Sequence, residues 1–370
     1  MQAKRKTMKI KKLIHAIIFG LLTILAYSCE TRSMIKGETS PVIDANGNKL
    51  PNSISEIIKE KIGGIDQYFI IRGADTSKPV ILFLHGGPGS PETPIMRAMN
   101  PTIEKDFVMV YWEQRGAGKS YSNRIPPETM NLEQFISDAQ EVSDYLIKRF
   151  GKEKIFIMGH SWGSFLGILT AYQHPELYHA YFGVGQSCKQ YEGEKVSFDW
   201  VKEQASLLND KKGMKRLSKI TFPSKNADSD EFIKFVMQER KYVNKYGGAI
   251  HGESSILSLL KFILNADEYS FSDKRNYMRG SKFSISHLFS TQIQTDLSQE
   301  IDSMQVPVYI FQGKYDYQCP TLTAKKFYDQ LKAPDKDFFI FENSAHNLNI
   351  EEPEKFNAIV LEKAQELFKY

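Results

Sequence analysis

Short apolar runs alternate with longer helical patterns over most of this 370-residue chain. Residues 65–72 alternate apolar and polar side chains, as a half-buried strand does. Six other runs are mostly apolar, which is typical of buried strands: 79–84, 107–112, 154–158, 179–184, 306–311 and 337–341. Residues 132–150 instead carry apolar side chains at a helical period. Strands that alternate with helices predict a mostly parallel sheet with helices on both faces.

The pattern changes between about residues 187 and 300. Strand-like runs disappear there, and helical stretches rich in Lys, Tyr, Phe and Asn replace them. The alternation of strand-like runs and helical patterns returns at Val306. A helical segment inserted at this point would lie over the carboxyl edge of the sheet, where such folds place their sites. We therefore predict a core formed by residues 41–186 and 302–370, with a helical cap at residues 187–301.

The N-terminus has the pattern of an export signal. Residues 1–28 contain six basic residues and no acidic ones, and the apolar run 13–27 follows the basic cluster. That run is shorter than the about 20 residues that a membrane-spanning helix needs, and the arrangement is typical of a secretory signal. It ends at Ala26-Tyr27-Ser28-Cys29, which resembles a bacterial lipobox, although Leu25 lies one place too far from the cysteine and Tyr27 is bulky.

From this pattern we predict a signal peptide of lipoprotein type at residues 1–28, a lipid on Cys29 and a tether at residues 29–40. An ordinary signal peptide and an uncleaved anchor are the alternatives. All three place the protein outside the cytoplasm, in the bacterial cell envelope and attached to a membrane if the lipid or the anchor is present. The sequence does not indicate an oligomeric state.

Charge and cysteine content exclude several classes of function. Without residues 1–28 the chain is close to neutral, so it lacks the basic face that a nucleic acid would need. If Cys29 is lipidated, Cys188 and Cys319 remain, which are too few for a disulfide framework but leave a single bond between them possible. The Cys and His residues show no metal-ligand spacing. We expect no metal, no cofactor and no nucleic-acid partner.

The motif Gly159-His160-Ser161-Trp162-Gly163 follows the apolar run 154–158 and precedes a helical pattern. A serine between such a strand and such a helix is typical of a nucleophile elbow. The flanking glycines permit a tight turn because they have no Cβ, and the helix N-terminus favours developing negative charge. We therefore predict that Ser161 is a nucleophile.

A serine hydroxyl needs a base, because it is a weak nucleophile without one. His346 follows the last expected strand, whereas His85 and His160 lie within glycine turns that we expect them to shape. Asp316 follows the run 306–311. Three other acidic residues lie on the wrong sides of their strands: Asp302, Asp335 and Asp337. In strand–turn–helix hydrolases the order along the chain is Ser, acid, His, so we predict a triad of Ser161, Asp316 and His346.

Two further glycine-rich stretches need an interpretation. His85-Gly86-Gly87-Pro88-Gly89 follows the run 79–84, and we predict that the backbone N–H groups of Gly87 and Trp162 form an oxyanion hole. The stretch 116–120, Gly-Ala-Gly-Lys-Ser, looks like the end of a phosphate-binding loop. Glu113 occupies the place of the first glycine that such a loop requires, so nucleotide binding is excluded.

Together these motifs resemble the proline iminopeptidase branch of the α/β-hydrolase superfamily. The likeness extends from about Gly63 to the C-terminus and is specific at residues 85–89, 111–120 and 159–164. It implies an α/β-hydrolase fold with an inserted helical cap. It also implies release of an N-terminal residue, often proline, from peptides by a Ser-Asp-His triad beneath that cap.

The chain departs from this family in two places. Glu113 stands where the family usually has Asp, and the cap glutamates that bind the substrate's free amine have no recognisable counterpart. Glu253 and Glu268 are the candidate amine partners. We predict acyl transfer to water with a short peptide as substrate. The alternatives are an esterase, lactonase or amidase with the same triad, and a noncatalytic ligand-binding lipoprotein.

Overall fold

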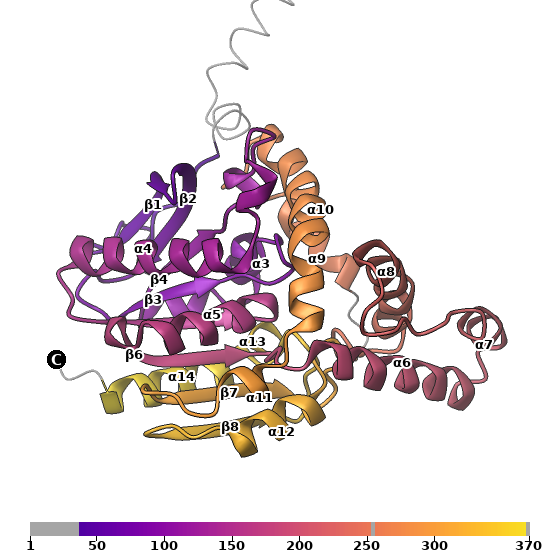
Figure 1. Ribbon diagram of the computed structural model, residues 1–370. Coiled ribbons are helices and arrows are strands. Elements are labelled where there is room, and N and C mark those ends of the chain that lie inside the picture. Colours follow the sequence, from indigo (N-terminus) through magenta and orange to yellow (C-terminus); the bar gives the residue numbers. More distant parts are fainter. Residues whose placement is uncertain (1–36, 253–255, 368–370) are drawn as a thin grey trace, which may run out of the picture.

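The computed structural model describes residues 37–252 and 256–367 and contains an eight-stranded sheet in the order β1-β2-β4-β3-β5-β6-β7-β8 (Figure 1). Its strands are β1 (Ile54–Ile62), β2 (Ile65–Gly73), β3 (Val80–Leu84), β4 (Val108–Glu113), β5 (Ile155–His160), β6 (Tyr178–Val184), β7 (Val308–Gly313) and β8 (Lys336–Phe341). Strand β2 is antiparallel to both of its neighbours, and all other neighbouring strands are parallel. The predicted mostly parallel sheet is therefore confirmed.

Helices cover both faces of the sheet. On one face, Val80, Leu82 and Leu84 pack with side chains of α4 (Leu132–Phe150), α5 (Trp162–Gln173) and α12 (Thr321–Gln330). On the other, Ile81 and Phe83 pack with α3 (Thr93–Met99) and α14 (Pro353–Leu367). Successive side chains of a strand point to opposite faces, so a strand covered on both sides must be apolar throughout. This explains the apolar runs of the sequence.

Strand β1 was not predicted. Its sequence Ile-Ser-Glu-Ile-Ile-Lys-Glu-Lys-Ile mixes charged and apolar side chains, and most of them are half-buried. The strand lies at the edge of the sheet and pairs with β2 alone. Charged side chains on an edge strand hinder pairing with other chains, and here they also hide the strand pattern.

Between β6 and β7 the described chain is helical. The helices are α6 (Gln190–Leu207), α7 (Lys211–Leu217), α8 (Ser229–Lys245), α9 (Ile256–Leu264), α10 (Phe271–Gln294) and α11 (Leu297–Glu300). They occupy the segment expected as the helical cap. An apolar cluster of their own joins α6, α7, α8 and α10, and in Figure 1 α6 to α8 project from one end of the sheet.

The last residues of the expected tether are hydrogen-bonded to the folded body. The N–H of Glu38 donates to the Asp267 carbonyl at 2.7 Å, and the Arg72 guanidinium donates to Thr39 and Ser40. Residues 37–40, expected as the end of the tether, are therefore part of the body, because these hydrogen bonds fix their backbone. The signal peptide and Cys29 lie outside the described residues. No helix in the described ranges is both long and apolar enough to cross a membrane.

A buried ion pair joins α4 to the segment after β4. The Asp138 carboxylate, fully buried, accepts from the Arg115 Nε at 2.9 Å and Nη2 at 3.0 Å. Gln67 and Gln134 donate to the same carboxylate at 2.7 and 2.8 Å. A buried pair is tolerated when its remaining polar atoms are hydrogen-bonded, as they are here. Arg115 of the motif at 111–120 thus supports the fold.

Replacing Asp138 by Ala is expected to lower the free energy of unfolding by about 3–5 kcal/mol, because Arg115 would stay buried without its partner. Chemical denaturation measures this loss. Asp144→Ala, an exposed position on the same helix, is the control and should change stability by less than about 0.5 kcal/mol. Equal effects of the two substitutions would contradict this account of Arg115.

Candidate active site

Ser161 lies in a strained turn between β5 and α5. Its backbone has φ 55° and ψ −118°, a conformation that costs a non-glycine residue about 1–3 kcal/mol. Close packing holds it, since a Cβ on Gly159 would overlap the Gly163 carbonyl, and one on Gly163 would overlap the Leu84 carbonyl of β3. The Ser161 N–H also donates to Val184 of β6 at 2.9 Å. The turn therefore places Ser161 at the carboxyl edge of the sheet.

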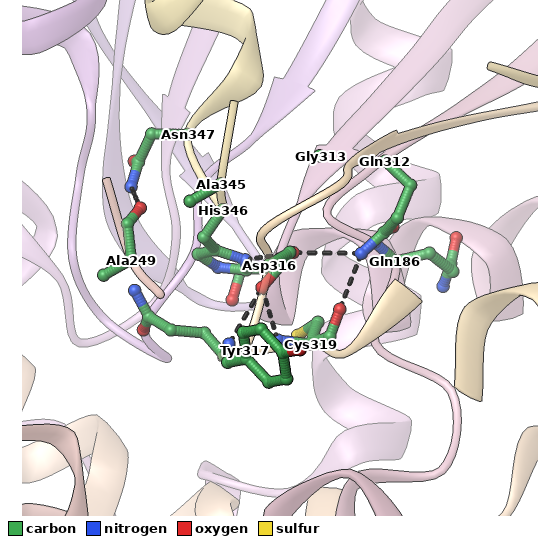
Figure 2. A network of polar contacts seen from close by, with 12 residues as sticks. Gln186, Ala249, Gln312, Gly313, Asp316, Tyr317, Cys319, Ala345, His346 and Asn347 are labelled. Atoms are coloured by element: carbon green, nitrogen blue, oxygen red, sulfur yellow. Dashed lines mark hydrogen bonds and ion pairs between the residues drawn. The ribbon is translucent and has the colours of Figure 1, made fainter. Parts of the chain in front are cut away.

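Asp316 and His346 follow β7 and β8 and meet at the same edge. The Asp316 Oδ2 lies 2.8 Å from the His346 Nδ1 (Figure 2). Gln312 donates to Oδ2 at 3.0 Å, and the backbone N–H groups of Gln318 and Cys319 donate to Oδ1 at 2.8 Å each. These donors fix the carboxylate against the imidazole.

The other acidic residues considered from the sequence have different partners. Asp335 accepts a hydrogen bond from Tyr309 at 2.6 Å, and Asp337 forms an ion pair with Lys363 at 2.9 Å. Cys188 and Cys319 are free, buried thiols. Among the residues that the structure describes, no three His, Cys, Asp or Glu side chains gather as a metal site would require.

The loop that carries His346 is held from two sides. Glu351 accepts from the backbone N–H groups of Ala345 at 3.2 Å and Asn347 at 3.0 Å, and burial raises the pKa of this carboxyl to about 7. From the cap side, the Asn347 side chain donates to the Ala249 carbonyl at 2.9 Å, as Figure 2 shows. The position of the imidazole is thus set by both the core and the cap.

The loop after β3 approaches Ser161 closely. A Cβ on Gly86 would lie 3.1 Å from the Ser161 Cβ, and Gly87 has φ 115°, which favours glycine. We find no hydrogen-bond acceptor in residues 37–252 and 256–367 for the backbone N–H groups of Gly87 and Trp162. Both N–H groups are therefore available to a substrate oxygen.

Gln114 fastens this loop to the elbow. Its Nε2 donates to the His85 carbonyl at 3.0 Å, and its Oε1 accepts from the Trp162 indole at 3.0 Å. Gln114 belongs to the motif at 111–120, but nothing in that motif indicates that this side chain connects two loops.

Glu92 and His160 form a second link that the sequence analysis missed. The Glu92 Oε1 accepts from the Gly86 N–H at 2.8 Å and lies 2.9 Å from the His160 Nδ1. The His160 Nε2 lies 3.0 Å from the His346 carbonyl, and the two imidazole centroids are 4.7 Å apart. The loops after β3, β5 and β8 are therefore joined through one carboxylate and one imidazole.

These neighbours act on the pKa values of both histidines. Burial lowers the pKa of His160, but the Glu92 carboxylate more than offsets this and the pKa is raised overall. Burial lowers the pKa of His346 in spite of the Asp316 carboxylate, and the nearby His160 lowers it further. His346 is thus kept neutral to a lower pH than an ordinary histidine.

Two cavities meet at Ser161, and Gly87 and Gln318 line both of them. The first, of about 360 Å³, lies among α6, α8 and α10, and its walls include Ile233, Val236, Met237, Arg240, Ile285 and Phe289. The second, of about 240 Å³, lies beside α9, and its walls include Ile95, Leu259, Leu260, Ile263, Tyr277 and His346.

Of the two glutamates expected as amine partners, the structure describes only Glu268. Glu268 is 2% exposed, forms an ion pair with Arg97 and lines neither cavity. Its carboxylate is paired with Arg97, so the structure does not bring it to the cavities where we expected an amine partner. Glu253 lies outside the described residues. Glu113 accepts from the Lys119 N–H and also lines neither cavity, and burial raises its pKa to about 7.

Two other cap glutamates lie close to the first cavity. Arg240, which lines it, donates to Glu194 of α6 and to Glu239 of α8, at 2.5 and 2.7 Å. Both carboxylates are fully buried. The sequence contained them among many cap glutamates, and no pattern distinguished them from those on solvated helix faces.

The reaction of Ser161 with a fluorophosphonate is expected to slow as pH falls through the pKa of His346, because a protonated imidazole accepts no proton. The midpoint should lie below 6.5, the ordinary histidine pKa. In His160→Asn the midpoint should rise, because a neighbouring positive charge is lost. Labelling rates measured across the acid limb check both shifts.

The matched control for this measurement is His287→Asn, on α10 and outside both cavities. It should leave the midpoint unchanged. A wild-type midpoint above 6.5 would contradict the lowered pKa of His346. No difference between His160→Asn and wild type would show that His160 does not influence the pKa of His346.

Comparison with known proteins agrees with this architecture. A family model described as "alpha/beta hydrolase fold" matches residues 79–353. The "Probable aminopeptidase YbaC" of Bacillus subtilis (strain 168) is 34% identical over 306 residues, 81% of this chain and 93% of that protein. A proline iminopeptidase of Heyndrickxia coagulans is 25% identical over 292 residues, 76% of this chain and 88% of that protein.

A solved structure of a proline iminopeptidase from Mycobacterium smegmatis superposes with a TM-score of 0.60 at 16% identity, covering 84% of this chain and 98% of that one. At this identity the likeness is one of fold. The family match extends from β3 to the start of α14 and includes Ser161, Asp316 and His346. The chain therefore belongs to the α/β-hydrolase family, near its proline iminopeptidase branch.

Proposed function

We propose that the protein is a serine hydrolase that works through an acyl-enzyme on Ser161. The observation that carries this proposal is the 2.8 Å contact between Asp316 and the His346 Nδ1, in a cavity that both His346 and Ser161 line. An imidazole that donates Nδ1–H to a carboxylate keeps Nε2 as the atom that exchanges protons.

In the proposed reaction the Ser161 Oγ attacks a carbonyl carbon while the His346 Nε2 takes the hydroxyl proton. The N–H groups of Gly87 and Trp162 donate to the developing oxyanion, and each such donor typically contributes about 3–4 kcal/mol. His346 then gives the proton to the leaving atom, and water hydrolyses the acyl-enzyme by the reverse proton path. Asp316 stays ionised and stabilises the imidazolium.

We further propose that the substrate is a short peptide with a free N-terminus, so that the enzyme is an aminopeptidase. Three buried acceptor atoms without a donor support this: the Glu194 Oε2, the Asn244 Oδ1 and the Gln292 Oε1. Asn244 and Gln292 line the first cavity. A buried acceptor without a partner costs free energy, and a protonated amine would supply the missing donors.

The charge around Arg240 supports the same proposal. Two buried carboxylates, Glu194 and Glu239, share one guanidinium, so the cluster is negative when both are ionised. Burial raises the pKa of Glu239 to about 7, and the nearby Glu194 carboxylate raises it too. A bound ammonium would offset this repulsion. The apolar wall formed by Ile233, Val236 and Met237 makes an ester with an apolar acyl group the second candidate.

Amino-acid naphthylamides with a free or an acetylated amine separate these proposals. The free-amine amides of proline and leucine are expected to be cleaved, and acetylation should lower kcat/KM by about 10- to 100-fold, because hydrogen bonds to the charged amine are lost. Glu194→Gln should reduce this preference. Glu203→Gln, an exposed glutamate on the same helix, is the matched control and should keep it.

Nitrophenyl esters complete the panel. Turnover of esters without turnover of free-amine amides would reject the aminopeptidase and favour the esterase. A folded protein that neither turns over any substrate nor reacts with a fluorophosphonate at Ser161 would be a binding protein instead of an enzyme.

A further inference from the structure

The two cavities at Ser161 both have apolar walls, but they differ in the polar groups that line them. We propose that the second cavity, formed by Ile95, Leu259, Leu260, Ile263 and Tyr277, binds the leaving group and selects an apolar residue directly after the scissile bond. This inference rests on the proposed acyl transfer at Ser161, and it assigns a direction to the substrate.

The position of His346 gives that direction. Ser161 and Gly87 line both cavities, so a substrate whose carbonyl lies at Ser161 can extend into each of them. His346 and the next residue, Asn347, line the second cavity but not the first. Because the base must deliver its proton to the leaving atom, that atom has to lie within hydrogen-bond reach of the imidazole. The leaving group therefore enters the second cavity, and the acyl part enters the first.

The polar groups agree with this assignment. The unpartnered oxygens of Asn244 and Gln292 belong to the first cavity, where the acyl part would bring the free amine. In the second cavity the two ionisable groups beside His346, Glu92 and His160, are already bonded to each other at 2.9 Å. A pair satisfied in this way offers a ligand little further binding free energy.

The apolar walls of the second cavity then determine its preference. Leu259, Leu260 and Ile263 come from α9, Ile95 from α3 and Tyr277 from α10. An apolar side chain that leaves water for such walls gains free energy in proportion to the area it buries, whereas glycine gains none. Apolar pockets typically discriminate by about 10- to 200-fold for a single extra group.

Helix α9 offers a matched pair of variants for the test. Leu260 lines the second cavity and is 41% exposed, whereas Leu264 lies one turn further on, is 63% exposed and lines neither cavity. Both positions reach solvent, so Leu260→Glu and Leu264→Glu should fold alike, which circular dichroism and thermal denaturation verify.

The experiment compares leucyl-phenylalanine amide with leucyl-glycine amide, which share their acyl part and therefore their deacylation step. Wild type should prefer the phenylalanine amide in kcat/KM by about tenfold or more. Leu260→Glu should lower this ratio toward one, and Leu264→Glu should leave it at the wild-type value. Deacylation should be unchanged in both variants, because the leaving group has departed by then.

A second series keeps the test independent of the aminopeptidase proposal. Benzyl and methyl esters of one acetylated amino acid differ in their leaving alcohol and carry no free amine. If peptides are not cleaved but benzyl esters are preferred, with the preference lost in Leu260→Glu alone, the leaving-group cavity stands and the aminopeptidase proposal falls. A wild-type ratio near one in the series that is turned over, an equal change in both variants, or no turnover of either series would overturn the inference.

Discussion

The backbone of Ser161, with φ 55° and ψ −118°, is the constraint on which the rest of the site depends. A serine adopts this conformation only where its surroundings enforce it. Here the enforcement comes from glycines, since Gly163 lies against the Leu84 carbonyl of β3 and Gly159 lies against Gly163. The same packing brings the first turn of α5 against the end of β3. Gly86, two residues beyond Leu84, then lies next to Ser161.

A second layer of polar contacts holds the loops that surround this turn. Glu92 bridges Gly86 and His160, and Gln114 bridges His85 and Trp162. In the loop after β8, the Glu351 carboxylate accepts hydrogen bonds from the backbone N–H groups on either side of His346. Donors that are fixed before the reaction need no reorganisation during it, and residues that lock the reactive groups keep their geometry precise. His160 also has an electrostatic effect, because it lowers the pKa of His346.

Much of the fold could be predicted because the strands of a sheet covered on both faces must be apolar. Strands β3 to β7 are visible for that reason, and the half-buried edge strand β8 still shows an apolar run at 338–341. The carboxyl ends of these parallel strands then bring Ser161, Asp316 and His346 to one edge. Strand β1 was not predicted, because the charged side chains that this edge strand carries interrupt its apolar pattern.

Glu92 and Glu351 could not be found from the sequence, since their partners are backbone N–H groups of loops that meet only in the folded chain. Glu268 was misplaced for a related reason. The sequence shows that the cap is helical, but the face that each cap helix turns toward Ser161 depends on packing between distant helices. Glu194 and Glu239 lie near the site because α6 and α8 pack side by side around Arg240.

The central claim is that Ser161 carries the acyl group, and trapping that intermediate tests it most directly. The protein is mixed with a nitrophenyl ester, quenched in acid within the first turnover and digested, and the acylated peptide is located by mass spectrometry. The account predicts one acyl group on Ser161, none in Ser161→Ala, and a much slower acylation in His346→Gln at neutral pH. Hydrolysis of the ester at the wild-type rate by Ser161→Ala, or an acyl group on another residue, would contradict it.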